Sequence, residues 1–70
     1  MNEIQGKTTG IGKRLLSVPE AADYLGRTSW AVRALIDNGK LPVVRLDRRV
    51  QIDRLDLDRI IERCKVRIPD

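Results

Sequence analysis

The spacing of apolar residues predicts two short helices, a hairpin and a third helix, in that order along the chain. The first helix is expected within residues 17–26, where Ser17 and Glu20 have the spacing of a capping box. Gly26 follows, and glycine commonly ends a helix in the left-handed conformation. Four apolar residues of this segment fall on one side at helical spacing: Val18, Ala21, Ala22 and Leu25.

The second helix is expected between a cap at Thr28 or Ser29 and a stop at Gly39. At about 100° per residue, one arc of this helix is apolar. It holds Ala31, Val32, Leu35 and Ile36. The opposite arc holds Ser29, Trp30, Arg33, Ala34 and Asp37. The only tryptophan of the chain is therefore predicted to face away from the core, beside an arginine.

Residues 43–52 alternate between apolar strand formers and polar residues, which predicts a short hairpin with one apolar and one basic face. Asp47 and Arg48 stand at its turn, without the glycine or asparagine that tight hairpins prefer. The last helix is expected to begin at an N-cap, Asp53. Its buried stripe is expected to consist of Leu57, Ile60, Ile61 and Cys64.

Seventy residues provide one small domain, which we place at residues 15–66. Residues 1–14 are polar and rich in glycine, and we expect a flexible arm there; residues 67–70 form a short tail. The triplet Gly6–Thr8 has the letters that end a phosphate-binding loop. The glycine that such a loop requires further upstream would fall on Met1, and no strand can precede it, so no nucleotide site is expected.

Positive charge is concentrated in the middle of the chain. The formal net charge is +4, and residues 26–52 carry six basic side chains against two acidic ones. Residues 17–25 carry two acids and no base, and the segment from Asp53 onward is balanced. A one-sided basic surface favours a polyanion such as nucleic acid.

Several classes of site are not expected. The chain has one cysteine and no histidine, which leaves no internal disulfide and no usual zinc ligand set. Without a nucleophile–base pair or a metal set, we expect no enzyme and no cofactor. No apolar run is long enough for a bilayer and no signal-peptide pattern is present, so a soluble, intracellular protein is expected. The acids of the last helix are expected to act as caps and ion-pair partners: Asp53, Asp56, Asp58 and Glu62.

Two short helices joined through a glycine form the helix-turn-helix pattern, whose second helix enters the major groove of DNA. At its N-terminus the Thr28 and Ser29 hydroxyls suit a phosphate, Arg33 can pair with guanine, and Ala34 can touch a thymine methyl. Trp30 can pack on sugar or base edges while its Nε1–H donates to a phosphate. The alternative is that Trp30 packs against the hairpin or the arm and fills a core that lacks phenylalanine.

The hairpin after the two helices is interpreted as a wing. Three arginines lie near its tip and can reach phosphates or a minor groove: Arg45, Arg48 and Arg49. The alternative is a solvated strand face whose charge only prevents edge pairing.

Residues 15–61 resemble the small excisionase-type winged helix-turn-helix family, which is related to the DNA-binding part of the MerR regulators. The resemblance is carried by "SVPEAADYLG", "TSWAVRALIDNGKLP", "VVRLDRRVQI" and "DRLDLDRII". It implies a groove-binding second helix with a major-groove set consisting of Arg27, Thr28, Ser29, Trp30 and Arg33. It implies a wing set consisting of Arg45, Arg48 and Arg49. Family wings usually turn through glycine, and the second helix often carries an aromatic residue where Arg33 stands.

The favoured hypothesis is an excisionase, or recombination directionality factor, encoded by a phage or a prokaryote. Such a protein binds and bends double-stranded DNA beside an attachment site, cooperates with an integrase and associates with copies of itself on DNA. One alternative is a small transcriptional regulator of phage or plasmid genes that uses the same surface. Another is a protein-interaction adaptor whose Trp30 patch binds a protein.

Overall fold

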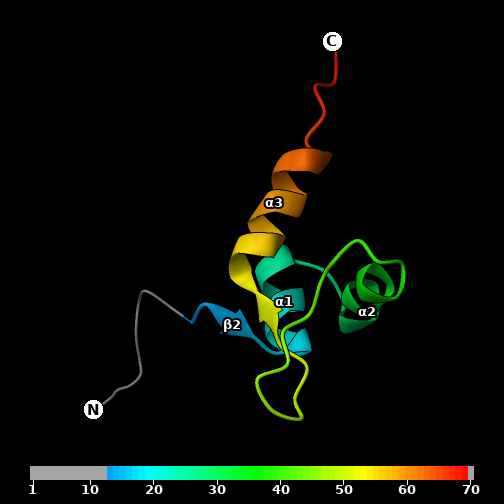
Figure 1. The fold of residues 1–70 in the computed structure, drawn as a ribbon. Coiled ribbons are helices and arrows are strands. Elements are labelled where there is room, and N and C mark those ends of the chain that lie inside the picture. The colour runs from blue at the N-terminus through cyan, green and yellow to red at the C-terminus, as the bar shows by residue number, and fades with distance from the viewer. Residues whose placement is uncertain (1–12, 70) are drawn as a thin grey trace, which may run out of the picture.

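The computed structural model describes residues 13–69, and within them three helices and a small antiparallel sheet share one core (Figure 1). The order is β2 (Leu15–Leu16), α1 (Val18–Leu25), α2 (Ser29–Asp37), β3 (Ile52–Asp53) and α3 (Arg54–Cys64). This confirms the predicted fold class, mainly helical with a small β component. The expected flexible arm, residues 1–14, lies outside the described residues except for its last two, Lys13 and Arg14.

Helix α1 begins with the capping box that the sequence predicts. The Glu20 N–H donates to the Ser17 hydroxyl at 3.2 Å, and the Ser17 N–H donates to the Glu20 carboxylate at 2.9 Å. Pro19 occupies the first turn, where its missing N–H has no helical partner to lose. Lys13 forms an ion pair with Glu20, and its hydrogen bond, with that from the Ser17 backbone, lowers the pKa of the carboxyl group. The two bonds of the capping box satisfy the backbone N–H groups of Ser17 and Glu20, which have no partner within the helix.

Both helices of the first pair end at a glycine in the left-handed conformation. Gly26 has φ 68° and Gly39 has φ 74°. After α1, the N–H of Gly26 donates to Asp23 and that of Arg27 to Ala22; after α2, the N–H of Gly39 donates to Ile36 and that of Lys40 to Leu35. This pattern of two backward bonds is the Schellman motif, which turns the chain sharply at each helix end.

Eight small and aliphatic residues form the core. They are Leu16, Val18, Ala21, Ala22, Val32, Leu41, Ile52 and Leu57. Every described helix and strand contributes at least one of them, and the segment between α2 and the wing contributes Leu41. Four further apolar residues pack partly buried against this cluster: Leu25, Leu35, Ile36 and Ile60.

The two strands of the sheet lie far apart in the sequence. Leu15 pairs with Asp53 and Leu16 with Ile52, in antiparallel register. The Arg54 N–H also donates to the carbonyl of Arg14 at 2.8 Å. The sequence predicts no strand at Leu15–Leu16. This pairing ties the beginning of the described chain to the beginning of α3.

The hairpin is shorter than the alternating pattern predicts. Its strands pair only at Val44 and Gln51, whose backbone N–H groups donate to each other's carbonyls at 2.7 and 3.0 Å. Residues 45–50 form a loop, and Leu46, expected on the apolar face, is 75% exposed. That expectation is wrong because the chain leaves the strand after Val44, so alternation no longer decides which side chains face the core.

The buried stripe expected along α3 is wrong at its C-terminal end. Leu57 is fully buried and Ile60 is half-buried, but Ile61 is 38% exposed and Cys64 is exposed. Figure 1 shows the last turns of α3 rising beyond the end of α1. Ile61 and Cys64 instead line an open hollow of about 350 Å³ together with residues of α2 such as Ala31 and Leu35, so the end of the stripe faces α2 without being closely packed against it.

Three of the four acids of α3 act as the sequence predicts, whereas Asp58 accepts a hydrogen bond from the Tyr24 hydroxyl at 2.6 Å in place of the expected cap or ion pair. The Asp53 carboxylate caps the helix by accepting from the Leu55 N–H at 3.0 Å. Asp56 accepts a hydrogen bond from Arg59 at 2.8 Å. Glu62 accepts one from Lys65 at 2.7 Å.

Candidate nucleic-acid interface

Helices α1 and α2 are joined by a three-residue turn around Gly26. The turn brings the N-terminus of α2 to the end of α1, and the cap of α2 is Thr28, whose hydroxyl accepts from the Ala31 N–H at 3.1 Å. Ser29 is therefore the first helical residue rather than the cap. The Thr28 hydroxyl keeps its own proton, so it can donate to a phosphate while still accepting the capping bond.

Trp30 lies on the outer face of α2. Its side chain is 78% exposed, whereas Val32 of the same helix is fully buried. The alternative that the indole fills the core is wrong. A large ring left in solvent on a small domain is typical of a surface that meets a partner.

Arg33 lies near Trp30 on the same helix and is also exposed. It lines a hollow of about 230 Å³ between α2 and the wing, together with Ile36, Asp37 and Val50. Because α2 and the wing border one hollow, Arg33 and the base of the wing lie on the same side of the molecule. Of the other members of the predicted major-groove set, Arg27 and Thr28 are exposed and Ser29 is half-buried. Ala34, predicted to touch a thymine methyl, is half-buried and presents less surface.

The wing tip is shaped by an aspartate. The Asp47 carboxylate accepts from the backbone N–H of Arg49 at 2.8 Å. This bond closes an Asx turn, which allows the loop to reverse without glycine. The Arg49 guanidinium also approaches Asp47, with 3.9 Å between Nε and the carboxylate oxygen.

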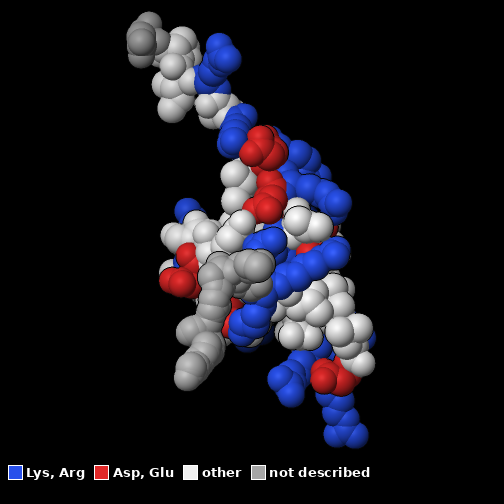
Figure 2. All heavy atoms as spheres, turned by 90° about the vertical axis from the view of Figure 1, so that its left-hand side faces the viewer, with Lys and Arg blue, Asp and Glu red and all other residues white. Residues whose placement is uncertain are grey.

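The arginines of the wing extend into solvent. Arg45, Arg48 and Arg49 are all exposed. In Figure 2, Lys and Arg side chains project from the lower end of the molecule, where Figure 1 places the wing loop. The alternative of a regular strand face does not fit residues 45–50, since this segment is loop.

Most of the predicted arginines are not used by the fold. Within residues 13–69, the side chains of Arg14, Arg49 and Arg59 form ion pairs, and Arg54 also has an interaction inside the chain. No ion-pair or side-chain hydrogen-bond partner is found in the described chain for four of the predicted site arginines: Arg27, Arg33, Arg45 and Arg48. Their charge is therefore available to an anion without breaking an internal contact.

The described residues form neither a metal-binding cluster nor a helix that could span a membrane. Across residues 13–69, no group of three or more His, Cys, Asp and Glu side chains is arranged to hold a metal ion. In the described part of the chain, no helix is long and apolar enough to cross a bilayer.

A family model described as a helix-turn-helix domain matches residues 15–65. Searches of curated proteins and of solved structures give no significant match to the chain. The matched range includes both helices of the motif, the turn at Gly26, the wing and α3. In a helix-turn-helix the second helix lies in the major groove with its N-terminal residues at the bases, and α2 is the second helix of this motif here. The chain belongs to the helix-turn-helix domain family.

Proposed function

We propose that the chain is a sequence-specific DNA-binding protein that works without catalysis, with α2 in the major groove and the wing on the backbone. The observation that carries this proposal is the outer face of α2. Trp30 is exposed there near Arg33, and Arg33 lines a hollow together with Val50 at the base of the wing. Arg27, Thr28 and Ser29 lie at the N-terminus of α2, where a phosphate meets free N–H groups and the positive end of the helix dipole.

The division of roles between α2 and the wing is tested with two variants. The target duplex is first selected from a random pool, and affinity is then measured by gel shift at several salt concentrations. Arg33→Ala is expected to weaken the selected duplex by about 1–3 kcal/mol and a scrambled duplex much less, because its guanidinium reads a base. Arg48→Ala is expected to weaken both duplexes alike and to reduce the salt slope by about one, because it contacts a phosphate.

Arg67→Ala is the matched control, since Arg67 is an exposed arginine in the tail rather than on α2 or the wing. It should leave the ratio of specific to non-specific affinity unchanged. Equal losses for Arg33→Ala and Arg48→Ala on both duplexes contradict the assigned roles. Affinity that does not change between low and high salt contradicts DNA binding itself and favours a protein-binding adaptor.

Trp30 gives a direct readout of the same interface. It is the only tryptophan, so the emission of the chain reports this one position. Titration with the selected duplex should quench or shift that emission at the stoichiometric point. Emission that stays unchanged while the gel shows a complex would place Trp30 outside the interface.

We further propose that the protein acts as an excisionase, a recombination directionality factor that bends DNA beside an attachment site to assist an integrase. The support is the sequence resemblance and the small size of the unit, since one such domain gives a small interface and gains from cooperation with neighbouring copies. An excision assay with the integrase encoded nearest to the gene tests this. Stimulation of excision supports the proposal, and DNA binding without stimulation favours a transcriptional regulator.

A further inference from the structure

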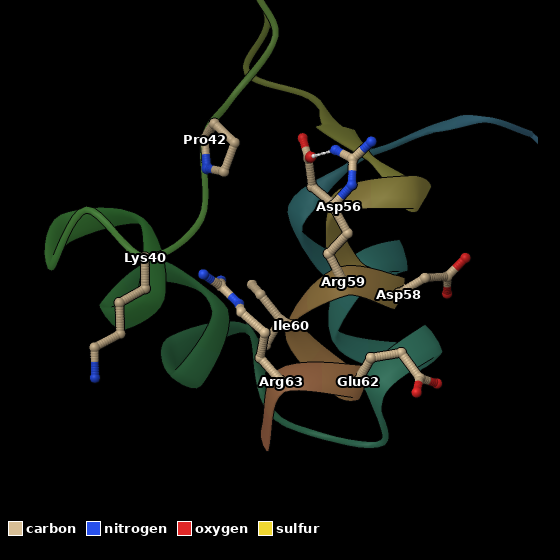
Figure 3. A pocket seen from close by; sticks show the side chains of 8 residues that line it. All are labelled: Lys40, Pro42, Asp56, Asp58, Arg59, Ile60, Glu62 and Arg63. Carbon is tan, nitrogen blue, oxygen red and sulfur yellow. Dashed lines mark hydrogen bonds and ion pairs between the residues drawn. The ribbon is translucent and has the colours of Figure 1, made fainter. Parts of the chain in front are cut away.

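A cleft of about 590 Å³ lies between α3 and the segment that leaves α2 (Figure 3). Lys40 and Pro42 form the wall on the α2 side, and Ile60 and Arg63 belong to the wall on α3. Neither Trp30 nor Arg33 nor any wing arginine lines it. The cleft is therefore distinct from the proposed DNA interface.

The carboxylates around the cleft already have partners inside the chain. Each accepts a hydrogen bond: Asp56 from Arg59 at 2.8 Å, Asp58 from Tyr24 at 2.6 Å, and Glu62 from Lys65 at 2.7 Å. In Figure 3 the carboxylates of Asp58 and Glu62 project from the opposite side of α3. Their charge is directed away from the opening of the cleft.

The two remaining cations of the wall have no partner. Within the described chain, neither the Lys40 ammonium nor the Arg63 guanidinium has an ion pair or side-chain hydrogen bond, and both are exposed. Figure 3 shows the Arg63 side chain reaching across the gap toward Lys40 and Pro42. Between these cations the floor is apolar, formed by Pro42 and the half-buried Ile60.

We propose that this cleft binds a segment of a partner protein in which a carboxylate stands next to an apolar side chain. The carboxylate pairs with Lys40 and Arg63, and the apolar side chain packs on Pro42 and Ile60. DNA fits the cleft less well, because a phosphate backbone has no apolar group that would pack on this floor. The inference goes beyond DNA binding and does not depend on it.

The probe is a capped eight-residue peptide in which leucine and glutamate alternate, added to the full chain labelled with ¹⁵N. Amide shifts are expected to concentrate at Lys40, Ile60 and Arg63. Arg63→Glu is expected to weaken binding about fivefold, since it replaces an exposed ion pair by repulsion. Arg67→Glu changes the charge equally on an exposed tail residue and should change affinity by less than about twofold.

Two further variants sharpen the test. Lys40→Glu should repeat the loss seen for Arg63→Glu, and the double variant Lys40→Glu/Arg63→Glu should instead prefer a peptide in which lysine replaces glutamate. The inference is overturned if millimolar peptide shifts no amide in the cleft, or if the glutamine version of the peptide binds wild type as well as the glutamate version. A loss of DNA affinity for Arg63→Gln as large as that for Arg48→Ala also overturns it, because the cleft would then be a phosphate contact.

The outcome is separable from that of the DNA-binding proposal. The peptide experiment contains no DNA, and Arg33→Ala should bind the peptide like wild type. Loss of DNA binding with the peptide shifts intact therefore rejects only the proposed function. Intact DNA binding without peptide shifts rejects only the cleft.

Discussion

At the scale of single residues, the position of Trp30 on its helix decides the character of the surface. Helical spacing places it opposite Val32, and the structure leaves 78% of its side chain exposed while Val32 is fully buried. The core is completed by Leu, Ile, Val and Ala without any aromatic ring. The indole therefore contributes little to the folded state and is available to a partner.

Substitution of Trp30 should separate binding from stability. Trp30→Ala is expected to change the free energy of unfolding by less than about 0.5 kcal/mol, because little of the ring is buried. Leu57→Ala, which truncates a fully buried side chain, should cost about 2–5 kcal/mol. Urea denaturation followed by circular dichroism measures both. A loss for Trp30→Ala comparable to that for Leu57→Ala would mean that the ring packs in solution.

At the scale of elements, the helix-turn-helix depends on a glycine whose backbone conformation other residues adopt only with strain. Gly26 has φ 68°, and its own N–H and that of Arg27 donate to carbonyls at the end of α1. A Cβ added at Gly26 would meet nothing within 4 Å, so space does not require glycine here. The backbone conformation does, because the left-handed region is unfavourable for residues with a Cβ.

Gly26→Ala is expected to lower the free energy of unfolding by about 1–2 kcal/mol through this conformational cost alone. Gly26→Asn should cost less, since asparagine tolerates the left-handed region better. Denaturation midpoints of the two variants and of wild type measure this expected order of stability. If alanine proves as stable as wild type, the turn has adopted another conformation.

At the scale of the whole molecule, contacts between distant segments fix how α3 sits on the helix-turn-helix. The Arg14 guanidinium donates two hydrogen bonds to the Asp53 carboxylate, at 3.2 and 3.0 Å, next to the pairing of β2 with β3. The Tyr24 hydroxyl of α1 donates to Asp58 of α3 at 2.6 Å, which raises the pKa of Tyr24. These contacts and the shared core hold β3 and α3 against β2 and α1.

The Arg14–Asp53 contact predicts a dependence of stability on acid. The hydrogen bond from Arg14 lowers the pKa of Asp53 below its ordinary value, so the ionised carboxylate stabilises the fold. That contribution is fully present above the usual aspartate pKa of about 3.9 and is lost as the pH falls through the lower, folded value. Asp53→Asn should therefore be less stable at pH 7 and should lose less stability than wild type in acid.

Urea midpoints measured at neutral pH and at about pH 3 test this difference. Glu20→Gln is the comparison, because the pKa of Glu20 is also lowered and its carboxylate also bonds within the chain. Glu20→Gln should also lose less stability in acid than wild type, by the amount that the ionised Glu20 carboxylate contributes. If Asp53→Asn and wild type lose stability in parallel, the contact with Arg14 contributes nothing to the fold.

The sequence by itself determined the features that local chemistry controls. The capping box at Ser17, the glycines at 26 and 39 and the apolar arc around Val32 act within a few residues, so their spacing specifies both helices and the outward face of Trp30. The same holds for the cap at Asp53 and the charge of the wing. These signals need no knowledge of what lies across the molecule.

Only the tertiary structure decided which faces are covered and which segments meet. The stripe on α3 is regular through Cys64, but burial stops near Ile60 because Ile61 and Cys64 line an open hollow beside α2. Leu15–Leu16 forms a strand because it pairs with Ile52–Asp53. Lys40 and Arg63 are 23 positions apart in the chain and line the same cleft. Burial and pairing depend on the lengths and positions of other elements, which periodicity along one segment does not contain.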